Sequence, residues 1–429
     1  MTPRRSPAAA LLLLAAGCAL ALGAETAATQ DLSVDQAVRE ALLHNLNLLA
    51  EKFNVPVAEA AVVTARLKPN PTLSLGNDHM YAFGHRFSEE SPTGGGPTEQ
   101  SLRVDFVRER GGKRRSRIDV AEKARSVAQY NLQDTMRSLI LDVQDGCIEV
   151  QQAKANYDLA HENASALQKV VEVNAARVKA GDLAEVDLSR SRVAKLQFEN
   201  QVLQTDATLR QARGKLNPLL GRPAGSELIH VVGEIRRDKE LPSIEEVRAY
   251  AIRARPDLLA LANDRDRAAA DVRLQQANSK VDWTVGAEVR RMQQVSPGGT
   301  VGGLFFSVPL PLYSRNQGEI QRARQQVSQL ETRIRALQTQ IQSDVTVAYD
   351  QCKTAKALVE RIESTMLSEA RGVYDSMEYS YRRGEASLLE LLDARRAFND
   401  TMQSLNDARA DYARSLYRID AYSGRSIQP

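Results

Sequence analysis

Two acidic residues near the end of the sequence, Glu390 and Asp393, have types and spacing that suggest chemistry. A separation of three residues places both carboxylates on one face of a helix. If several copies of the chain surround an axis, such a pair forms a ring of acid that selects for cations and binds a divalent ion. A solvated helix face is the alternative interpretation of the same pattern.

Other groupings of reactive side chains are weaker evidence for a functional site. His79, Met80 and His85 suggest a metal site, but their spacing is weak and the surrounding residues are typical of a loop. The sequence contains no paired His and Glu of a metallohydrolase, no phosphate-binding glycine loop and no nucleophile elbow. We therefore expect no enzyme activity, no cofactor and no resident metal.

The composition favours long helices over globular cores. Only 5% of the 429 residues are aromatic and 26% are charged, so the chain has few large apolar side chains with which to build the cores of large globular domains. The net charge of +3 gives no reason to expect nucleic acid as a partner. The basic run RERGGKRRSR, residues 108–117, is more consistent with anionic lipid headgroups, because the chain carries an export signal.

That signal is read from residues 1–24. Arg4 and Arg5 precede an apolar run, and small residues follow where a signal peptidase can cut. Cleavage before Cys18, with lipidation of that residue, is the alternative. No later run reaches the roughly 20 apolar residues of a membrane helix, so any membrane span would consist of strands.

The remaining sequence contains two copies of one internal repeat. Two pairs of segments are similar in sequence. The segment from Ser33, SVDQAVREALLHNLNLLAEKFNV, aligns with the segment from Ser243, SIEEVRAYAIRARPDLLALANDR. The segment around Gly181, VKAGDLAEVDL, aligns with the segment around Gly384, YRRGEASLLEL. Repeats of this length indicate a pseudo-symmetric duplication. The expected structural repeats are residues 25–225 and 226–429. Within each repeat the pattern predicts a helix, a strand, a loop, a strand, a very long helix, a turn and a helix.

The long helices carry a heptad seam. In the second copy the seam runs from Ile320 to Ile341, skips four residues to Val345 as one stutter, and continues through Cys352. That placement favours a small buried hydrophobe at Cys352 and leaves a bridge to Cys147 open. In the first copy, residues 114–177 contain no proline, which predicts a rod of about 95 Å.

The strands alternate between apolar and polar residues. Leu102, Val104 and Phe106 alternate with Arg103 and Asp105, as in the wall of a membrane barrel or in a half-buried soluble hairpin. Only about four strands are visible per chain, whereas the smallest membrane barrels need about eight. If the strands span a membrane, several chains must share one barrel.

At this point the sequence resembles the outer membrane efflux protein (TolC-type) family from about Leu32 to Gly424. The resemblance rests on the duplicated halves, the junctions FVRERGGKRRSRI and PLPLYSRNQGEI, and YSYRRGEASLLELLDARRAF near the end. The PLPLYSRNQG and GGKR junctions are similar to the heavy-metal branch, the cobalt-zinc-cadmium and copper-silver resistance channels. The implied fold is mainly α with a small β membrane part. A homotrimer would form a twelve-stranded β-barrel in the outer membrane, continued by a twelve-helix α-barrel through the periplasm.

The resemblance also implies a function and partners. The chain would be the passive exit duct of a tripartite pump, joined by a periplasmic adaptor protein to an inner-membrane transporter such as an RND pump. Heavy-metal cations are the expected cargo. A multidrug, organic-compound or type I secretion duct is the alternative, and a periplasmic coiled-coil adaptor or scaffold is a third interpretation.

The turns between the long helices supply the candidate site residues. Gly181 and Gly384 suit the ends of helices, and Asp182, Ser387 or Glu385 suit the caps of the helices that follow. By resemblance these turns form the periplasmic tip that contacts the adaptor, which assigns that contact to Arg177, Gly181, Arg383 and Gly384.

The resemblance places the acidic residues at the pore aperture. Glu390 and Asp393 match aspartates that line the aperture in the family, and Asp187 matches in the first copy. The first copy has no counterpart of the second acid, because Ser189 and Arg190 stand where it would be expected.

The strand-to-helix junctions are the last candidate feature. Pro309 and Pro311 are expected to end the last strand, because proline fits neither a strand interior nor a helix interior. The segment Arg315–Gly318 is expected to turn the chain into the seam helix. The first copy makes the same junction without proline, through Gly111 and Gly112.

Overall fold

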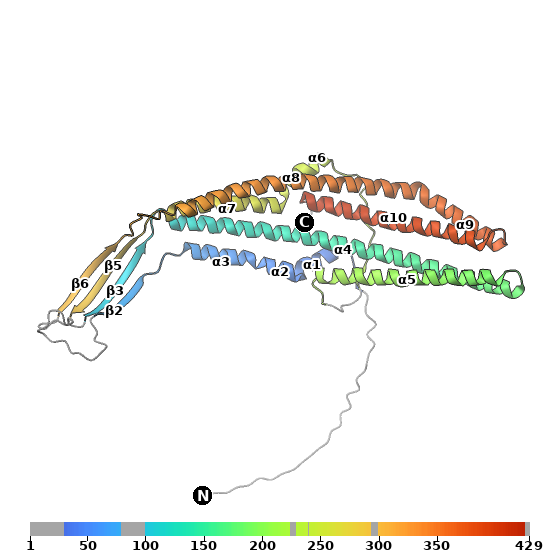
Figure 1. Ribbon diagram of the computed structural model, residues 1–429, viewed down its shortest axis with the longest axis horizontal. Coiled ribbons are helices and arrows are strands. Elements are labelled where there is room, and N and C mark those ends of the chain that lie inside the picture. Colours follow the sequence, from blue (N-terminus) through green and yellow to red (C-terminus); the bar gives the residue numbers. More distant parts are fainter. Residues whose placement is uncertain (1–29, 79–98, 224–228, 239, 293–298, 425–429) are drawn as a thin grey trace, which may run out of the picture.

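The computed structural model describes residues 30–78, 99–223, 229–238, 240–292 and 299–424. Long helices run side by side along the molecule, with a small sheet at one end and two helical hairpins at the other (Figure 1). The signal segment with Cys18, and the loop with His79, Met80 and His85, lie outside the described residues. Among the helices described, none is both long enough and apolar enough to cross a membrane.

The two halves of the chain contain nearly the same order of elements. The first half contains β1 (Gln30–Leu32), α1 (Val34–His44), α2 (Leu46–Lys52), α3 (Asn54–Arg66), β2 (Thr72–Asp78), β3 (Glu99–Arg108), α4 (Lys113–Ala180) and α5 (Glu185–Leu219). The second half contains β4 (Ile229–Val231), α6 (Ile244–Ala254), α7 (Pro256–Asn278), β5 (Trp283–Met292), β6 (Gly299–Ser307), α8 (Gln317–Arg361), the π-helix η1 (Ile362–Met366), α9 (Leu367–Arg383) and α10 (Leu388–Ser423).

The first helix of each half begins with the same capping interaction. Ser33 accepts a hydrogen bond from the backbone N–H of Gln36, and the Gln36 side chain accepts one from the backbone of Ser33. Ser243 and Glu246 form the same reciprocal pair at the start of α6. Such a capping box satisfies backbone donors that a helix start leaves free, so both halves begin their first helix at the same point.

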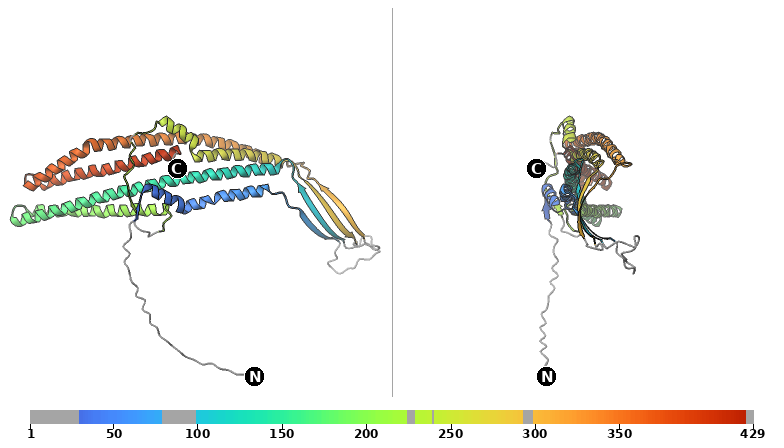
Figure 2. Two further views of the ribbon diagram at one scale, coloured as in Figure 1. Left: turned by 180° about the vertical axis from the view of Figure 1, so that it is seen from behind. Right: turned by 90° about the vertical axis from the view of Figure 1, so that its left-hand side faces the viewer.

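The predicted rod is present as α4, an uninterrupted helix of 68 residues. The second long helix follows the predicted seam, since Ala323, Leu330, Ile341 and Val345 are all buried. Its irregular hydrogen bonding lies further along, in η1, where the sequence pattern indicated nothing. Figure 2 shows the two rods from behind and along their length.

The sheet at the end of the rods has the antiparallel strand order β2-β3-β5-β6. Its register places Leu102 opposite Val289 and Val104 opposite Ala287, so the apolar residues gather on one face. Most of that face is uncovered, and Leu304 is 88% exposed. The other face carries ion pairs, among them Arg103 with Asp105 at 2.9 Å. The predicted division into an apolar and a polar face is therefore present.

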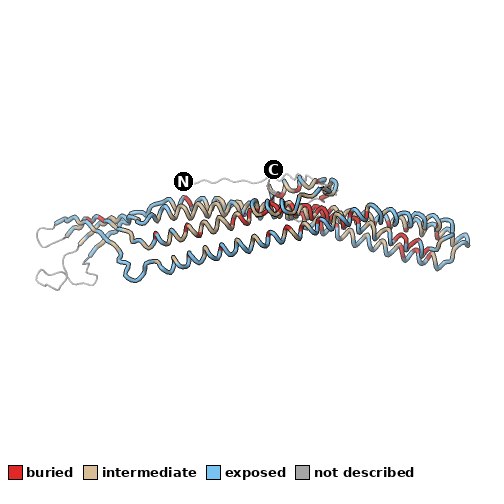
Figure 3. The backbone as a smooth tube through the Cα atoms, turned by 90° about the horizontal axis from the view of Figure 1, so that it is seen from above, coloured by how far each residue is buried: buried red, intermediate tan, exposed pale blue. Residues whose placement is uncertain are grey.

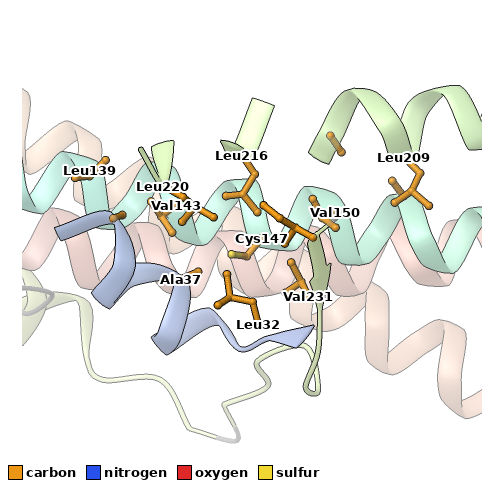
Figure 4. Packing of buried hydrophobic residues seen from close by; sticks show 14 of the residues in the cluster. Leu32, Ala37, Leu139, Val143, Cys147, Val150, Leu209, Leu216, Leu220 and Val231 are labelled. Carbon is orange, nitrogen blue, oxygen red and sulfur yellow. The ribbon is translucent and has the colours of Figure 1, made fainter. Parts of the chain in front are cut away.

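The core lies around the middle of the rods, where β1, α1 and α6 pack on the long helices. One cluster surrounds Cys147 on α4 and includes Leu32, Val143 and Leu216 (Figure 4). A second cluster surrounds Cys352. Both thiols are buried and unbridged, as a small hydrophobe would be, and burial raises the pKa of Cys147 to about 12. Figure 3 shows that buried residues are concentrated here and continue toward the hairpin tips.

Equivalent glycines fix the ends of α5 and α10 against this core. Gly221 has φ 77° and lies against the carbonyl of His44 at the end of α1. Gly424 has φ 80° and lies against Ala254 at the end of α6. A left-handed backbone favours glycine, and each close approach leaves little space for a side chain. The same helix-end contact is thus made once in each half.

Candidate functional site

The candidate site is the pair of hairpin tips at the end of the rods farthest from the sheet. Gly181 ends α4 with φ 82°, and Gly384 ends α9 with φ 78°. The N–H of Asp182 donates to the carbonyl of Arg177 at 2.9 Å, and the N–H of Glu385 donates to the carbonyl of Ser380 at 2.9 Å. Both ends are Schellman motifs, so the predicted glycine stops are confirmed.

The two tips differ in how the following helix begins. Ser387 caps α10 and forms a capping box with Glu390, whereas Ala184 stands at the N-cap of α5 with no side-chain hydrogen bond. Of the three predicted caps only Ser387 is correct. Asp182 and Glu385 lie within the turns, where Glu385 pairs instead with Arg383 at 3.1 Å.

Glu390 therefore has a structural role in addition to its predicted place at the aperture. Its carboxylate accepts hydrogen bonds from the backbone N–H and the hydroxyl of Ser387, both at 2.8 Å. These bonds favour the charged form and lower the pKa of Glu390 below its ordinary value. The side chain remains exposed and negatively charged at neutral pH.

The other two candidate acids each have an arginine one turn away. Asp393 is exposed and lies 3.6 Å from Arg396, and Asp187 lies 3.2 Å from Arg190. Exposed pairs of this kind are weak, because water and salt screen them. Nowhere in the described part of the chain do three or more His, Cys, Asp or Glu residues gather in a way that could hold a metal ion.

Arg177 joins the two hairpins. Its guanidinium donates to the backbone carbonyls of Tyr381 at 3.3 Å and Arg382 at 2.5 Å, which are in the last turn of α9. It also lies 5.7 Å from the centre of the Tyr381 ring. A cation at a helix C-terminus satisfies free carbonyls and stabilises the helix dipole. Arg383 is bound more locally, to the Tyr379 hydroxyl at 2.9 Å.

Buried polar contacts behind the tips were not indicated by the sequence. The Tyr381 hydroxyl donates to the side-chain oxygen of Asn174 at 2.7 Å, and Asn174 is fully buried. Arg395 is 6% exposed, lies 5.3 Å from the Tyr374 ring centre and donates to Asn163. Burial lowers the pKa of Arg395. The two hydrogen bonds join residues more than 200 positions apart.

The junction residues lie at the opposite end, between sheet and rods. Gly111 and Gly112 form the turn before α4, with φ values of 71° and 74°. Pro309 and Pro311 are exposed and follow β6, which ends at Ser307. Predicting Gly318 as part of the turn was wrong, because it lies in the first turn of α8.

Asn316 makes that turn instead. It has φ 62°, the one positive value among the non-glycine residues described, and its side-chain amide donates to the carbonyl of Gln275 at 2.8 Å. Asparagine tolerates the left-handed region better than most residues, and its hydrogen bonds to Gln275 stabilise the turn.

A family model described as outer membrane efflux protein matches residues 37–222 and 248–425. The chain belongs to the outer membrane efflux protein family. This membership decides against the periplasmic adaptor or scaffold interpretation, and it agrees with the duplicated rods, tips and sheet described above.

Individual relatives support the same family. The chain is 25% identical over 365 residues to the cobalt-zinc-cadmium resistance protein CzcC of Cupriavidus metallidurans, covering 85% of this chain and 83% of the relative. It is 23% identical over 412 residues to nodulation protein T of Rhizobium leguminosarum bv. trifolii, covering 91% and 85%.

The fold also matches a solved structure. Crystal structures of CusC, a protein described as forming a transmembrane channel, superpose with a TM-score of 0.74 at 16% identity, covering 91% of this chain and 92% of the other. This likeness establishes the TolC-type fold of the chain.

Proposed function

We propose that this chain is the outer-membrane exit duct of a tripartite efflux pump, and that it exports heavy-metal cations. The observation that carries the choice of cargo is the similarity to the cobalt-zinc-cadmium resistance protein along most of both chains. The duct is passive, and no step of chemistry is assigned to its residues.

The edges and faces of the sheet support a homotrimer. Among the strands described, β2 and β6 each pair on one side only, and both edge strands carry exposed leucines on the apolar face, such as Leu75 and Leu304. Unpaired edges and a large apolar face are unfavourable in water. In the proposed assembly the edges of three chains pair to close one barrel of twelve strands in the outer membrane, and the helices extend into the periplasm.

The charge along the rods supports passage of cations. A groove of about 1070 Å³ lies across α4, α5, α8 and α10 at the middle of the molecule. Acidic side chains outnumber basic ones along it, and the acids are Asp142, Asp145, Glu149, Asp350 and Asp411. β1, α1 and α6 pack against the long helices in the clusters around Cys147 and Cys352. We infer that this packed side faces outward and that the groove faces the interior of the duct.

The tips support docking of partner proteins. Gly181, Arg383 and Gly384 are exposed at the ends of the two hairpins, and Arg177 holds those hairpins together. A periplasmic adaptor that contacts both turns would connect the duct to an inner-membrane transporter such as an RND pump. Behind these contacts, the acidic Glu390 lies in the first turn of α10 and Asp393 in the second.

A duct for organic compounds or secreted proteins is the second candidate. It is favoured by the match to nodulation protein T, which covers slightly more of this chain than the metal-resistance relative does. A shared duct architecture does not specify its cargo, so the two candidates are separated by growth rather than by geometry.

The test is a resistance panel on a deletion strain. Loss of the gene is expected to lower the tolerated concentrations of zinc, cobalt, cadmium or copper, with tolerance of organic toxicants unchanged. A plasmid copy restores tolerance, and a copy lacking residues 1–24 serves as the control that is not exported. Sensitivity to organic toxicants alone would overturn the choice of metals and favour the second candidate.

A further inference from the structure

The junction between sheet and rods contains the one tryptophan of the chain, Trp283. It begins β5, at the end of the sheet next to the helices (Figure 1). The register places it directly opposite Arg108, the last residue of β3. Since side chains two apart share a face, Arg108 continues the apolar row that contains Phe106. A tryptophan and an arginine therefore end the uncovered apolar face.

The Trp283 ring is held between a cation and another ring. The guanidinium carbon of Arg110 lies 4.3 Å from its centre, and the ring of Phe306 lies 5.9 Å away in an edge-to-face arrangement. Both contacts are favourable and fix the orientation of the indole. Even so, the indole stays 38% exposed. The cluster is thus ordered without being closed.

The acids next to this cluster are already paired. Asp282 accepts from the Lys113 ammonium at 2.7 Å and from the backbone N–H of Arg110 at 2.9 Å. Glu109 is bound by Arg117. Within the described residues, no hydrogen bond or ion pair involves the guanidinium of Arg108 or Arg110. Arg108 and Arg110 are therefore two exposed positive charges at the junction whose side-chain hydrogen-bond donors have no partner among the described residues.

We propose that Arg108, Arg110 and Trp283 bind the phosphate of an anionic phospholipid, of the phosphatidylglycerol class, in the leaflet nearest the helices. This inference rests on the proposed function, which places the apolar face of the sheet in a membrane. Arginine presents several donors in a planar fork that fits phosphate oxygens. The acyl chains then lie along Phe106 and Phe306, and the indole lies at the level of the headgroup.

The second half offers no equivalent site. The corresponding junction carries Leu310, Leu312 and Tyr313, and Tyr313 is 91% exposed. The arginine there, Arg315, donates through Nε to the carbonyl of Pro311 at 3.4 Å. This stretch is apolar rather than cationic, so of these two described strand-to-helix junctions only that of the first half offers the headgroup site.

The sole tryptophan provides the measurement. The full-length protein is reconstituted in vesicles that contain brominated phosphatidylglycerol or brominated phosphatidylcholine, and quenching of Trp283 fluorescence reports which lipid contacts it. Each arginine near a charged lipid is expected to give about a fivefold preference for phosphatidylglycerol. That preference should disappear in the double variant Arg108→Gln with Arg110→Gln. Arg315→Gln is the matched control and should keep it.

The outcomes separate this inference from the function on which it rests. Equal quenching by the two lipids in the wild-type protein would overturn the headgroup site while leaving the sheet in the membrane. Equal loss of preference in Arg315→Gln would also overturn it, since the effect would be general surface charge. Absence of quenching by either lipid would place Trp283 outside the bilayer and contradict the proposed function as well.

Discussion

The first long helix runs unbroken from junction to tip, whereas the second changes its hydrogen bonding at a π-helix. The 68 residues of α4 contrast with the succession α8, η1 and α9. The start of the next helix differs too, since Ser387 forms a capping box and Ala184 does not. Duplication has kept nearly the same order of elements and the length of the long helices, but not their local bonding. Irregularities in the rods and junctions are therefore specific to one half.

The π-helix is held by a pair of arginines. Glu363, within η1, accepts from Arg237 at 2.5 Å and from Arg409 at 2.6 Å. Arg237 lies in the segment between β4 and α6, and Arg409 lies on α10, so three separate parts of the chain meet at this point. π-Helices inside α-helices are often found at functional positions. A joint at this point would allow the second hairpin to move relative to the first.

The largest loss of stability is expected at Gly221. This glycine and Gly424 make equivalent helix-end contacts in the two halves, but the space for a side chain is smaller at Gly221. A methyl group at Gly221 would overlap the His44 carbonyl oxygen, whereas at Gly424 the nearest atoms of Ala254 are 3.2 Å away. Both glycines have positive φ, which costs alanine about 1 kcal/mol. Gly221→Ala adds overpacking and should cost about 3 kcal/mol in all. Thermal unfolding followed by circular dichroism measures both variants, and equal losses would contradict this ranking.

A smaller loss is expected from Glu363→Gln, which removes the carboxylate of η1 that pairs with Arg237 and Arg409. Burial raises the pKa of Glu363, but the bonds from Arg409 and Arg237 outweigh it and lower the pKa below its ordinary value. A lowered pKa adds stability at neutral pH that is lost as the pH falls through the acidic range. The variant should lose about 1 kcal/mol at pH 7.

The pH dependence separates this effect from a packing defect. The difference in melting temperature between wild type and Glu363→Gln should shrink as the pH falls below the ordinary glutamate pKa. Glu360→Gln, at an exposed position nearby, is the control and should change little. A constant difference at all pH values would show that the charge is not responsible.

Exchanging the caps should reverse the contrast between the tips. Ser387→Ala is expected to destabilise the second tip by about 1 kcal/mol, and Ala184→Ser to stabilise the first by a similar or smaller amount. The exchange is feasible because both residues have extended backbones, with φ −69° at Ala184 and −80° at Ser387. Amide hydrogen exchange in the first turns of α5 and α10 reports each tip separately. Unchanged exchange in both would contradict the assigned role of the cap.

The smallest effect is expected on ion selectivity. Glu390→Gln with Asp393→Asn should lower the cation preference of single channels, because two charges per chain are removed from the second tip. Glutamine is accepted in a capping box, so the helix start is preserved and the charge is tested alone. Asp187→Asn, in the first tip, should have a weaker effect. Unchanged selectivity in the double variant would show that these acids do not line the aperture.

Features written in local sequence were predictable. Periodicity gave the rods and the two-faced strands, glycines gave the ends of α4 and α9, and the repeated Ser33 and Ser243 marked the same helix start. Each depends on residues within one or two turns of each other. The periodicity of the long helix did not, however, predict η1, since π bonding leaves the apolar spacing on either side intact.

Contacts across the duplication were not predictable. Arg177 reads as one more exposed cation until α9 is placed beside α4, and Asn174 is an ordinary polar residue until Tyr381 lies against it. Asn316 was missed because Gly318, two residues away, is the more usual residue for a turn. The partners of Arg177 and Asn174 lie more than 200 positions away, and only the packing of the two halves brings them close. Gln275, the partner of Asn316, lies 41 positions away on α7 of the same half.

The central claim is that three copies of these two unlike halves close into one duct through the outer membrane. Protein extracted from the outer-membrane fraction, shown to be a heat-sensitive trimer on a gel, is added to a planar lipid bilayer and its current is recorded. The account predicts discrete conductance steps that carry more cation than anion current. Recovery of the protein as a soluble periplasmic monomer that gives no conductance would contradict it.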